Sequence, residues 1–134
     1  MEPPSLRTRL LTVLWILGIL FPMGFLAAVW KPFGRLFDRA FASGWSHVVM
    51  HATLYLVLAF LLAQLLRPAA LRPALLVLCL ALLTGVAQEA LQWLSIQAEV
   101  GWAASAFDLL VDLSGALLGL GLARLWLVRR QPRV

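Results

Sequence analysis

The sequence has little charge and almost no cysteine. Only 13% of its 134 residues are charged, whereas 63% are hydrophobic; soluble globular domains carry about 25% charged residues. This composition excludes a small soluble domain of the ordinary kind and indicates an integral membrane protein. The one cysteine, Cys79, has no second cysteine in the chain to pair with. An intrachain disulfide is therefore excluded, and the cysteine content does not indicate a redox compartment.

Several motifs that announce a function are also missing. The chain has no phosphate-binding glycine loop, haem motif or cysteine metal cluster, so we expect no cofactor. Lysine and arginine outnumber aspartate and glutamate by 11 to 6, which can indicate a nucleic-acid partner. Here the basic residues lie at the ends of apolar runs and form no stripe with aromatic residues between them. We therefore expect the lipid bilayer as the partner, and no nucleic acid.

Long apolar runs are what the sequence does have. A helix of about 20 apolar residues crosses a bilayer, and four such runs predict an all-α membrane protein with a single transmembrane domain over residues 1–134. The first run is longer than the ~7–15 residues of a signal-peptide core, so we expect it to be a retained span in which Pro22 introduces a kink. The predicted spans cover about residues 10–30, 47–66, 74–95 and 105–128.

The segment between the first two runs has a different pattern. Phe33 and Phe37 repeat at helical spacing, while Arg35 and Asp38 occupy the other face. This pattern predicts a short amphipathic helix over about residues 33–42 that lies in the membrane interface between the first and second spans. We interpret it as a connector in preference to a functional lid.

The distribution of basic residues predicts the orientation. Cytoplasmic loops of membrane proteins carry an excess of lysine and arginine. Eight basic residues fall at one end of the predicted bundle and three at the other, so both termini are expected in the cytoplasm. The first group is Arg7, Arg9, Arg67, Arg72, Arg124, Arg129, Arg130 and Arg133, and the second is Lys31, Arg35 and Arg39.

The last predicted span contains two carboxylates. An ionisable side chain inside a membrane costs about 2.5–3.5 kcal/mol on insertion scales and by default indicates a functional site with a partner. At spacings of three and four residues, one helix face carries polar residues and then glycines. This face consists of Ser105, Asp108, Asp112, Gly115 and Gly119.

Two other spans bring polar side chains to the same depth, roughly 5–10 Å below the outer helix ends at ~1.5 Å of rise per residue. We therefore expect one polar cluster, in which protonated His51 lies between Glu89 and Asp108. The predicted members are His51, Tyr55, Glu89, Gln92, Ser105, Asp108 and Asp112.

These residues occur in an order that is similar to a known family. The elements resemble the VanZ-like family of small bacterial membrane proteins over about residues 45–120, and the matching motifs are His51-x-x-x-Tyr55, Glu89-x-x-Gln92 and Gly101-x-x-x-Ser105-x-x-Asp108 with Gly115. The chain departs from the family pattern at His47, usually acidic, at Trp102, usually basic, and at Asp112, usually asparagine. The resemblance implies the bacterial inner membrane and an association with resistance to glycopeptides, teicoplanin in particular, without a mechanism.

The residues leave four roles open for the cluster. It can be polar glue between three helices. His51, Glu89 and Asp108 can perform acid–base catalysis on a lipid-linked envelope substrate, although no nucleophile signature accompanies Ser105. The cluster can also bind or transport an amphipathic, glycopeptide-like molecule or protons. Finally, His47 and His51 are weak candidates for a metal site with Glu89 or an aspartate.

Gly115 and Gly119 form a close-packing face in the last span. Small residues four apart let two membrane helices approach closely. The partner helix is either in the same chain or in a second copy, so a homodimer is one expectation.

Overall fold

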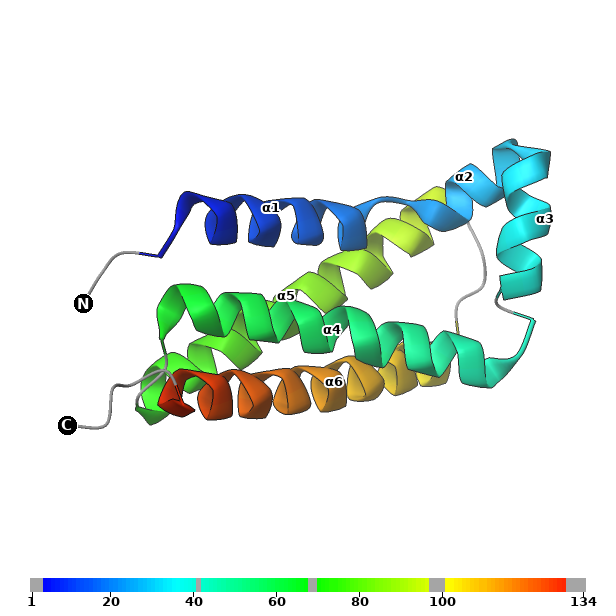
Figure 1. Cartoon of the computed structure of the whole chain (residues 1–134). Coiled ribbons are helices and arrows are strands. Elements are labelled where there is room, and N and C mark those ends of the chain that lie inside the picture. The colour runs from blue at the N-terminus through cyan, green and yellow to red at the C-terminus, as the bar shows by residue number, and fades with distance from the viewer. Residues whose placement is uncertain (1–3, 41, 68–69, 97–100, 130–134) are drawn as a thin grey trace.

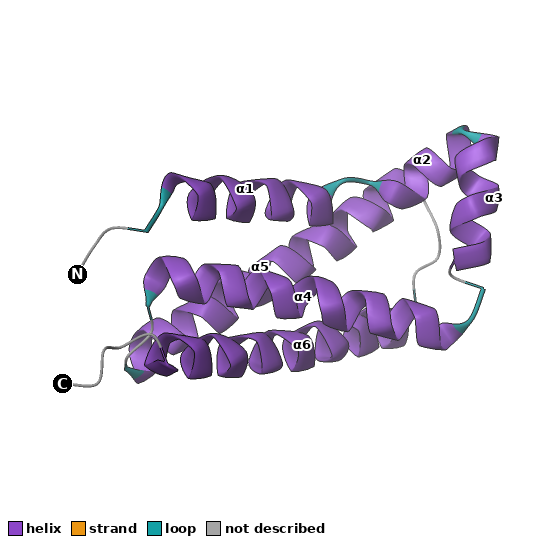
Figure 2. Cartoon of the chain, viewed as in Figure 1, coloured by secondary structure: helices purple, strands orange, loops and turns teal. Residues whose placement is uncertain are grey.

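The chain is entirely helical in the part that the structure describes. The computed structural model describes residues 4–40, 42–67, 70–96 and 101–129, with the backbone alone at 95 and 96. These ranges contain six helices and no strand, and Figures 1 and 2 show how the helices are arranged. The predicted all-α class is therefore confirmed. The helices are α1 (Leu6–Leu20), α2 (Met23–Val29), α3 (Lys31–Ala40), α4 (Gly44–Leu66), α5 (Leu71–Ile96) and α6 (Trp102–Arg129).

Three of these helices, α4, α5 and α6, are long and apolar enough to cross a membrane. Helices α1 and α2 make a fourth crossing segment if the pair, bent by 51°, counts as one span. The bend lies at Pro22, which is the N-cap of α2. Proline has no backbone N–H to donate to the preceding turn, and the expected kink at Pro22 is confirmed.

Local capping explains why some helices differ from the apolar runs. Helix α4 begins three residues before the predicted 47, because the Ser43 hydroxyl accepts a hydrogen bond from the Ser46 amide at 3.2 Å. It ends at Leu66, and the C-cap residue Arg67 has a left-handed φ of 47° and donates its backbone N–H to the Ala63 carbonyl oxygen at 2.8 Å. Helix α3 begins two residues before the predicted 33, and the predicted end at 42 is wrong because Ala42 lies in a bend.

The helices form a bundle with two distinct ends. Helix α1 begins and α6 ends at the same end of the molecule, while α3 lies at the opposite end (Figure 1). Helices α4 and α6 run side by side in the same direction. Helix α5, which lies between them in the sequence, runs back in the opposite direction at an oblique angle. The buried core is made by α4, α5 and α6 together with Ile19 of α1.

Among the described elements, α4 and α6 form the most extensive helix–helix contact. A Cβ atom built on Gly115 would lie well under 3.0 Å from the carbonyl oxygen of Ala52, and one on Gly119 would do the same at Leu56. The two glycines therefore let the backbones of α4 and α6 approach directly. The close-packing face is used within the chain, so a homodimer would need another surface.

Candidate functional site

The most buried polar contact joins α4 to α6. Nδ1 of His51 lies 2.8 Å from Oδ1 of Asp112, and the carboxylate accepts this hydrogen bond. His51 is 1% exposed and Asp112 is 2% exposed. Short hydrogen bonds to a charged group are stronger than neutral ones. This contact, the His51–Asp112 pair, fixes the imidazole ring between the two helices.

A second, longer contact between a histidine of α4 and an aspartate of α6 lies one helical turn closer to α3. Nδ1 of His47 is 3.6 Å from Oδ1 of Asp108, and these side chains are 40% and 17% exposed. The rings of His47 and His51 are in contact at a tilt of 44°, with 4.4 Å between their centroids. The two histidines of α4 thus face the two aspartates of α6 in matching order.

This order corrects the predicted pairing. The sequence predicted His51 between Glu89 and Asp108, whereas its hydrogen-bond partner is Asp112. Asp108 and Glu89 act on the His51 ring only at longer electrostatic range. The reason is the glycine contact with Ala52, which sets the position of α6 along α4 and leaves Asp108 one turn beyond His51.

The part of the site contributed by α5 differs from the predicted one. The hydroxyl of Tyr55, which is fully buried, donates a hydrogen bond to Oε1 of Gln88 at 2.9 Å. Gln88 was not among the predicted cluster members. Gly85, one turn earlier, was also missed: a Cβ there would lie 3.1 Å from Oδ2 of Asp112 and 3.4 Å from the Tyr55 hydroxyl. An isolated glycine in an apolar run was the available signal.

The remaining predicted members form no hydrogen bond with the pair among the described residues. Oε1 of Glu89 is buried, and it has no hydrogen-bond partner among the described residues. Gln92 lines the same cavity as His51. Ser105 is half-buried in the first turn of α6, and within the described ranges its hydroxyl makes no hydrogen bond. A serine–histidine nucleophile pair is therefore not formed there.

A cavity of about 260 Å³ lies beside the His51–Asp112 pair. The bend between α1 and α2 forms one wall, and α4, α5 and Phe37 of α3 form the others. Its polar lining consists of His47, His51, Gln88 and Gln92. Its apolar lining includes Ile19, Met50 and Leu54. The α1 wall is attached to α4 by the Trp15 indole, which donates a hydrogen bond to the Leu54 carbonyl at 2.9 Å.

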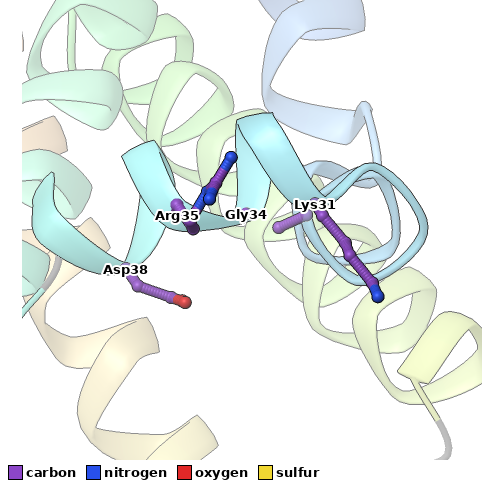
Figure 3. Close-up of a pocket in the computed structure, with 5 residues that line it drawn as sticks. Lys31, Gly34, Arg35 and Asp38 are labelled. Atoms are coloured by element: carbon purple, nitrogen blue, oxygen red, sulfur yellow. The ribbon is translucent and has the colours of Figure 1, made fainter.

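A larger and more open cavity of about 330 Å³ lies at α3, far from the pair in sequence (Figure 3). Its charged lining residues, Lys31, Arg35 and Asp38, all extend from α3 and are exposed. Gly34 lies beneath them, where a Cβ would be 2.5 Å from the Ala27 carbonyl oxygen. This cavity is a hollow between two short helices that pack closely, and no buried polar group lines it.

The geometry around His51 allows two kinds of chemistry. With Nδ1 bonded to a carboxylate, Nε2 is the nitrogen left to take a proton or bind a ligand. Nε2 is buried and has no partner among the described residues. Ligand atoms of His47, His51 and Asp108 also lie within 4.8 Å of one another. The site thus has the donors for acid–base chemistry and for a metal ion.

The comparisons with known proteins return nothing: no family model matches the chain, and no curated protein and no solved structure matches it. The function of the site is therefore argued from its own residues.

Proposed function

We propose that this chain is a VanZ-like protein of the bacterial inner membrane that binds an amphipathic molecule of the cell envelope beside His51. By this binding it contributes to resistance against glycopeptides of the teicoplanin type. The observation that carries the proposal is the cavity of about 260 Å³, where a buried histidine with an unpaired nitrogen meets an apolar wall.

The lining matches a molecule with one polar and one apolar part. Imidazole and amide groups of His51, Gln88 and Gln92 would hold the polar part, and Ile19 and Leu54 would contact the apolar part. Pockets that enclose a whole drug-sized ligand measure about 300–1,000 Å³. The smaller volume here suits a headgroup or a short section of a lipid-linked or glycopeptide-like molecule, with the rest of its chain left in the bilayer.

Two buried atoms argue against a purely structural role for the cluster. Nε2 of His51 and Oε1 of Glu89 have no hydrogen-bond partner among the described residues. Each buried polar group left unpaired costs about 1–3 kcal/mol. A cluster that served only to hold helices together would gain stability by satisfying these atoms or by replacing them with apolar groups. Of these two residues His51 lines the cavity, so its unpaired nitrogen supports a role in ligand binding.

The membrane topology forms part of this proposal. We infer four spans, with α1 and α2 forming one bent span, and both termini in the cytoplasm. The α3 end of the bundle then faces outward, and α3 lies in the outer interface with Trp30 stacked on Phe33 at 6.1 Å. The cavity and the His51–Asp112 pair would lie in the outer leaflet, where envelope molecules and glycopeptides are encountered.

The first prediction concerns this topology. Alkaline phosphatase fused after Val134 should be inactive, because the enzyme folds only outside the cytoplasm. The same reporter fused after Ala40 should be active, since α1 and α2 together cross the membrane once and α3 then lies in the outer interface. Activity of the Val134 fusion, or inactivity of the Ala40 fusion, would show that the orientation or the number of spans is wrong.

The second prediction concerns the cavity. Met50→Trp should fill it and return a resistant host to the glycopeptide susceptibility of cells without the gene, because Met50 lines the cavity. Val49→Trp is the matched control, since Val49 is 60% exposed on the outside of the bundle. The measurement is the minimal inhibitory concentration of teicoplanin at equal membrane expression. Equal resistance in the two variants would contradict binding in the cavity.

A membrane-embedded acid–base enzyme acting on a lipid-linked envelope substrate is the second candidate. The His51–Asp112 pair favours it, because a carboxylate-oriented imidazole is a common general base. Turnover separates the two functions. If His51→Gln retains binding of a lipid-linked precursor but loses its conversion, as followed by mass spectrometry, the chain is an enzyme. If wild-type protein binds the precursor without converting it, the binding function stands.

A further inference from the structure

We propose that His47, His51 and Asp108 bind a divalent metal ion of the zinc class near the α3 end of α4 and α6. This inference rests on the site of the proposed function. Metal content is measured on the purified protein without a resistance assay, so the two proposals can fail separately.

The first support is the pair of histidines on α4. His47 and His51 are four residues apart, and their ring centroids are 4.4 Å apart. Two imidazoles at this spacing on one helix face can bind the same ion, as in helical zinc motifs. Both side chains line the cavity, so the ion would be reached from there.

The second support is a carboxylate from the neighbouring helix. A ligand atom of Asp108 lies within 4.8 Å of those of both histidines. Zinc ligands about 2.0–2.2 Å from the metal in tetrahedral geometry are separated by roughly 3.3–3.6 Å. The distance of 3.6 Å between His47 Nδ1 and Asp108 Oδ1 already meets that separation. Side-chain rotation would have to bring the third ligand from within 4.8 Å to this separation, and two histidines with one carboxylate leave a fourth position open.

The third support comes from Asp112. Histidines that bind metals usually donate their other ring N–H to a carboxylate, which fixes the ring and the tautomer. Asp112 accepts such a bond from Nδ1 of His51 at 2.8 Å. Nε2 of His51, 99% of whose residue surface is buried, then carries a lone pair and has no partner within the described ranges. A metal ion would give this nitrogen the partner that it needs.

The alternative is that the two histidine–aspartate contacts only join α4 to α6. The test uses protein purified in detergent with a tag that contains no histidine, treated with a chelator and then titrated with ZnCl₂ alone. Wild-type protein should bind about one Zn²⁺ per chain in calorimetry and in elemental analysis. His47→Gln and Asp108→Asn should each weaken binding by at least about 100-fold, since even second-shell changes cost 10–100-fold.

These variants are chosen because His47 and Asp108 are partly exposed, so that folding is retained. Asp38→Asn on α3 is the control for the loss of one carboxylate and should bind zinc as the wild type does. Absence of saturable zinc binding by the wild type, or unchanged affinity in both variants, would overturn the proposal. A wild-type protein that binds zinc but confers no resistance would instead count against the proposed function alone.

Discussion

Gly115→Ala should remove most of the folded protein, whereas Gly121→Ala should leave it unchanged. The added methyl group would lie well under 3.0 Å from the carbonyl oxygen of Ala52, and nothing lies within 4 Å at Gly121. Overpacking costs about 1–3 kcal/mol where side chains can yield, and more where they cannot. Here a backbone atom is the obstacle, so we expect a loss of at least about 3 kcal/mol in spite of the better helix propensity of alanine.

The measurement is thermal unfolding in detergent together with the yield of monodisperse protein after size-exclusion chromatography. Gly119→Ala should behave as Gly115→Ala does, because its methyl group would meet the Leu56 carbonyl in the same way. Equal stability of the Gly115 and Gly121 variants would show that α4 and α6 are not in contact at Gly115 and Ala52.

Asp112→Ala should cost about 2–3 kcal/mol of unfolding free energy. Removal of one partner of a buried ion pair costs about 3–5 kcal/mol in soluble proteins, whereas interhelical hydrogen bonds in membranes average about 0.6 kcal/mol. The His51–Asp112 pair lies inside the bundle, and its loss leaves an imidazole buried without an acceptor. We therefore expect a value between these limits and nearer to the upper one. Asp112→Asn keeps an acceptor oxygen and should cost less.

A double-mutant cycle checks this expectation. Alanine at positions 51 and 112, singly and together, gives the coupling energy of the buried pair, as measured by unfolding in mixed micelles. The His47 and Asp108 contact is the internal control. Its side chains are partly exposed and 3.6 Å apart, so the coupling should be below about 1 kcal/mol. A coupling energy at the buried pair no larger than in this control would contradict the structural assignment.

The helices could be predicted from the sequence, because helix length and apolarity are local properties. Runs of about 20 apolar residues predicted the long helices, the helical spacing of Phe33 and Phe37 predicted α3, and Pro22 predicted the bend. The ends were less predictable. Ser43 extends α4 beyond its apolar run by capping the helix, and such a hydrogen bond depends on how the preceding loop is folded.

The pairing of the charged residues could not be read from the sequence. Two histidines four apart and two aspartates four apart match in two registers, one with His51 on Asp108 and one with His51 on Asp112. Hydrophobic pattern does not separate these registers, since both bury the same faces. The close contact between α4 and α6 decides between the two registers, because Gly115 must face the backbone at Ala52.

The contribution of α5 was hidden for a related reason. Gln88, Glu89 and Gln92 were all visible as polar residues near the end of an apolar run. Which of them meets Tyr55 depends on the rotation of α5 about its axis, and the buried hydroxyl selects Gln88. The cavity required a bend whose direction the proline alone does not specify.

The parallel arrangement of α4 and α6 also bears on how the protein is made. Chains fold from the N-terminus during synthesis, and parallel neighbours need an intervening helix that returns across the bundle. The histidines of α4 are therefore synthesised before Asp108 and Asp112, and the whole of α5 is made in between. Helix α6 supplies both aspartates together with Gly115 and Gly119, which contact α4. A chain interrupted before α6 would leave both histidines without the aspartates that they contact in the finished protein.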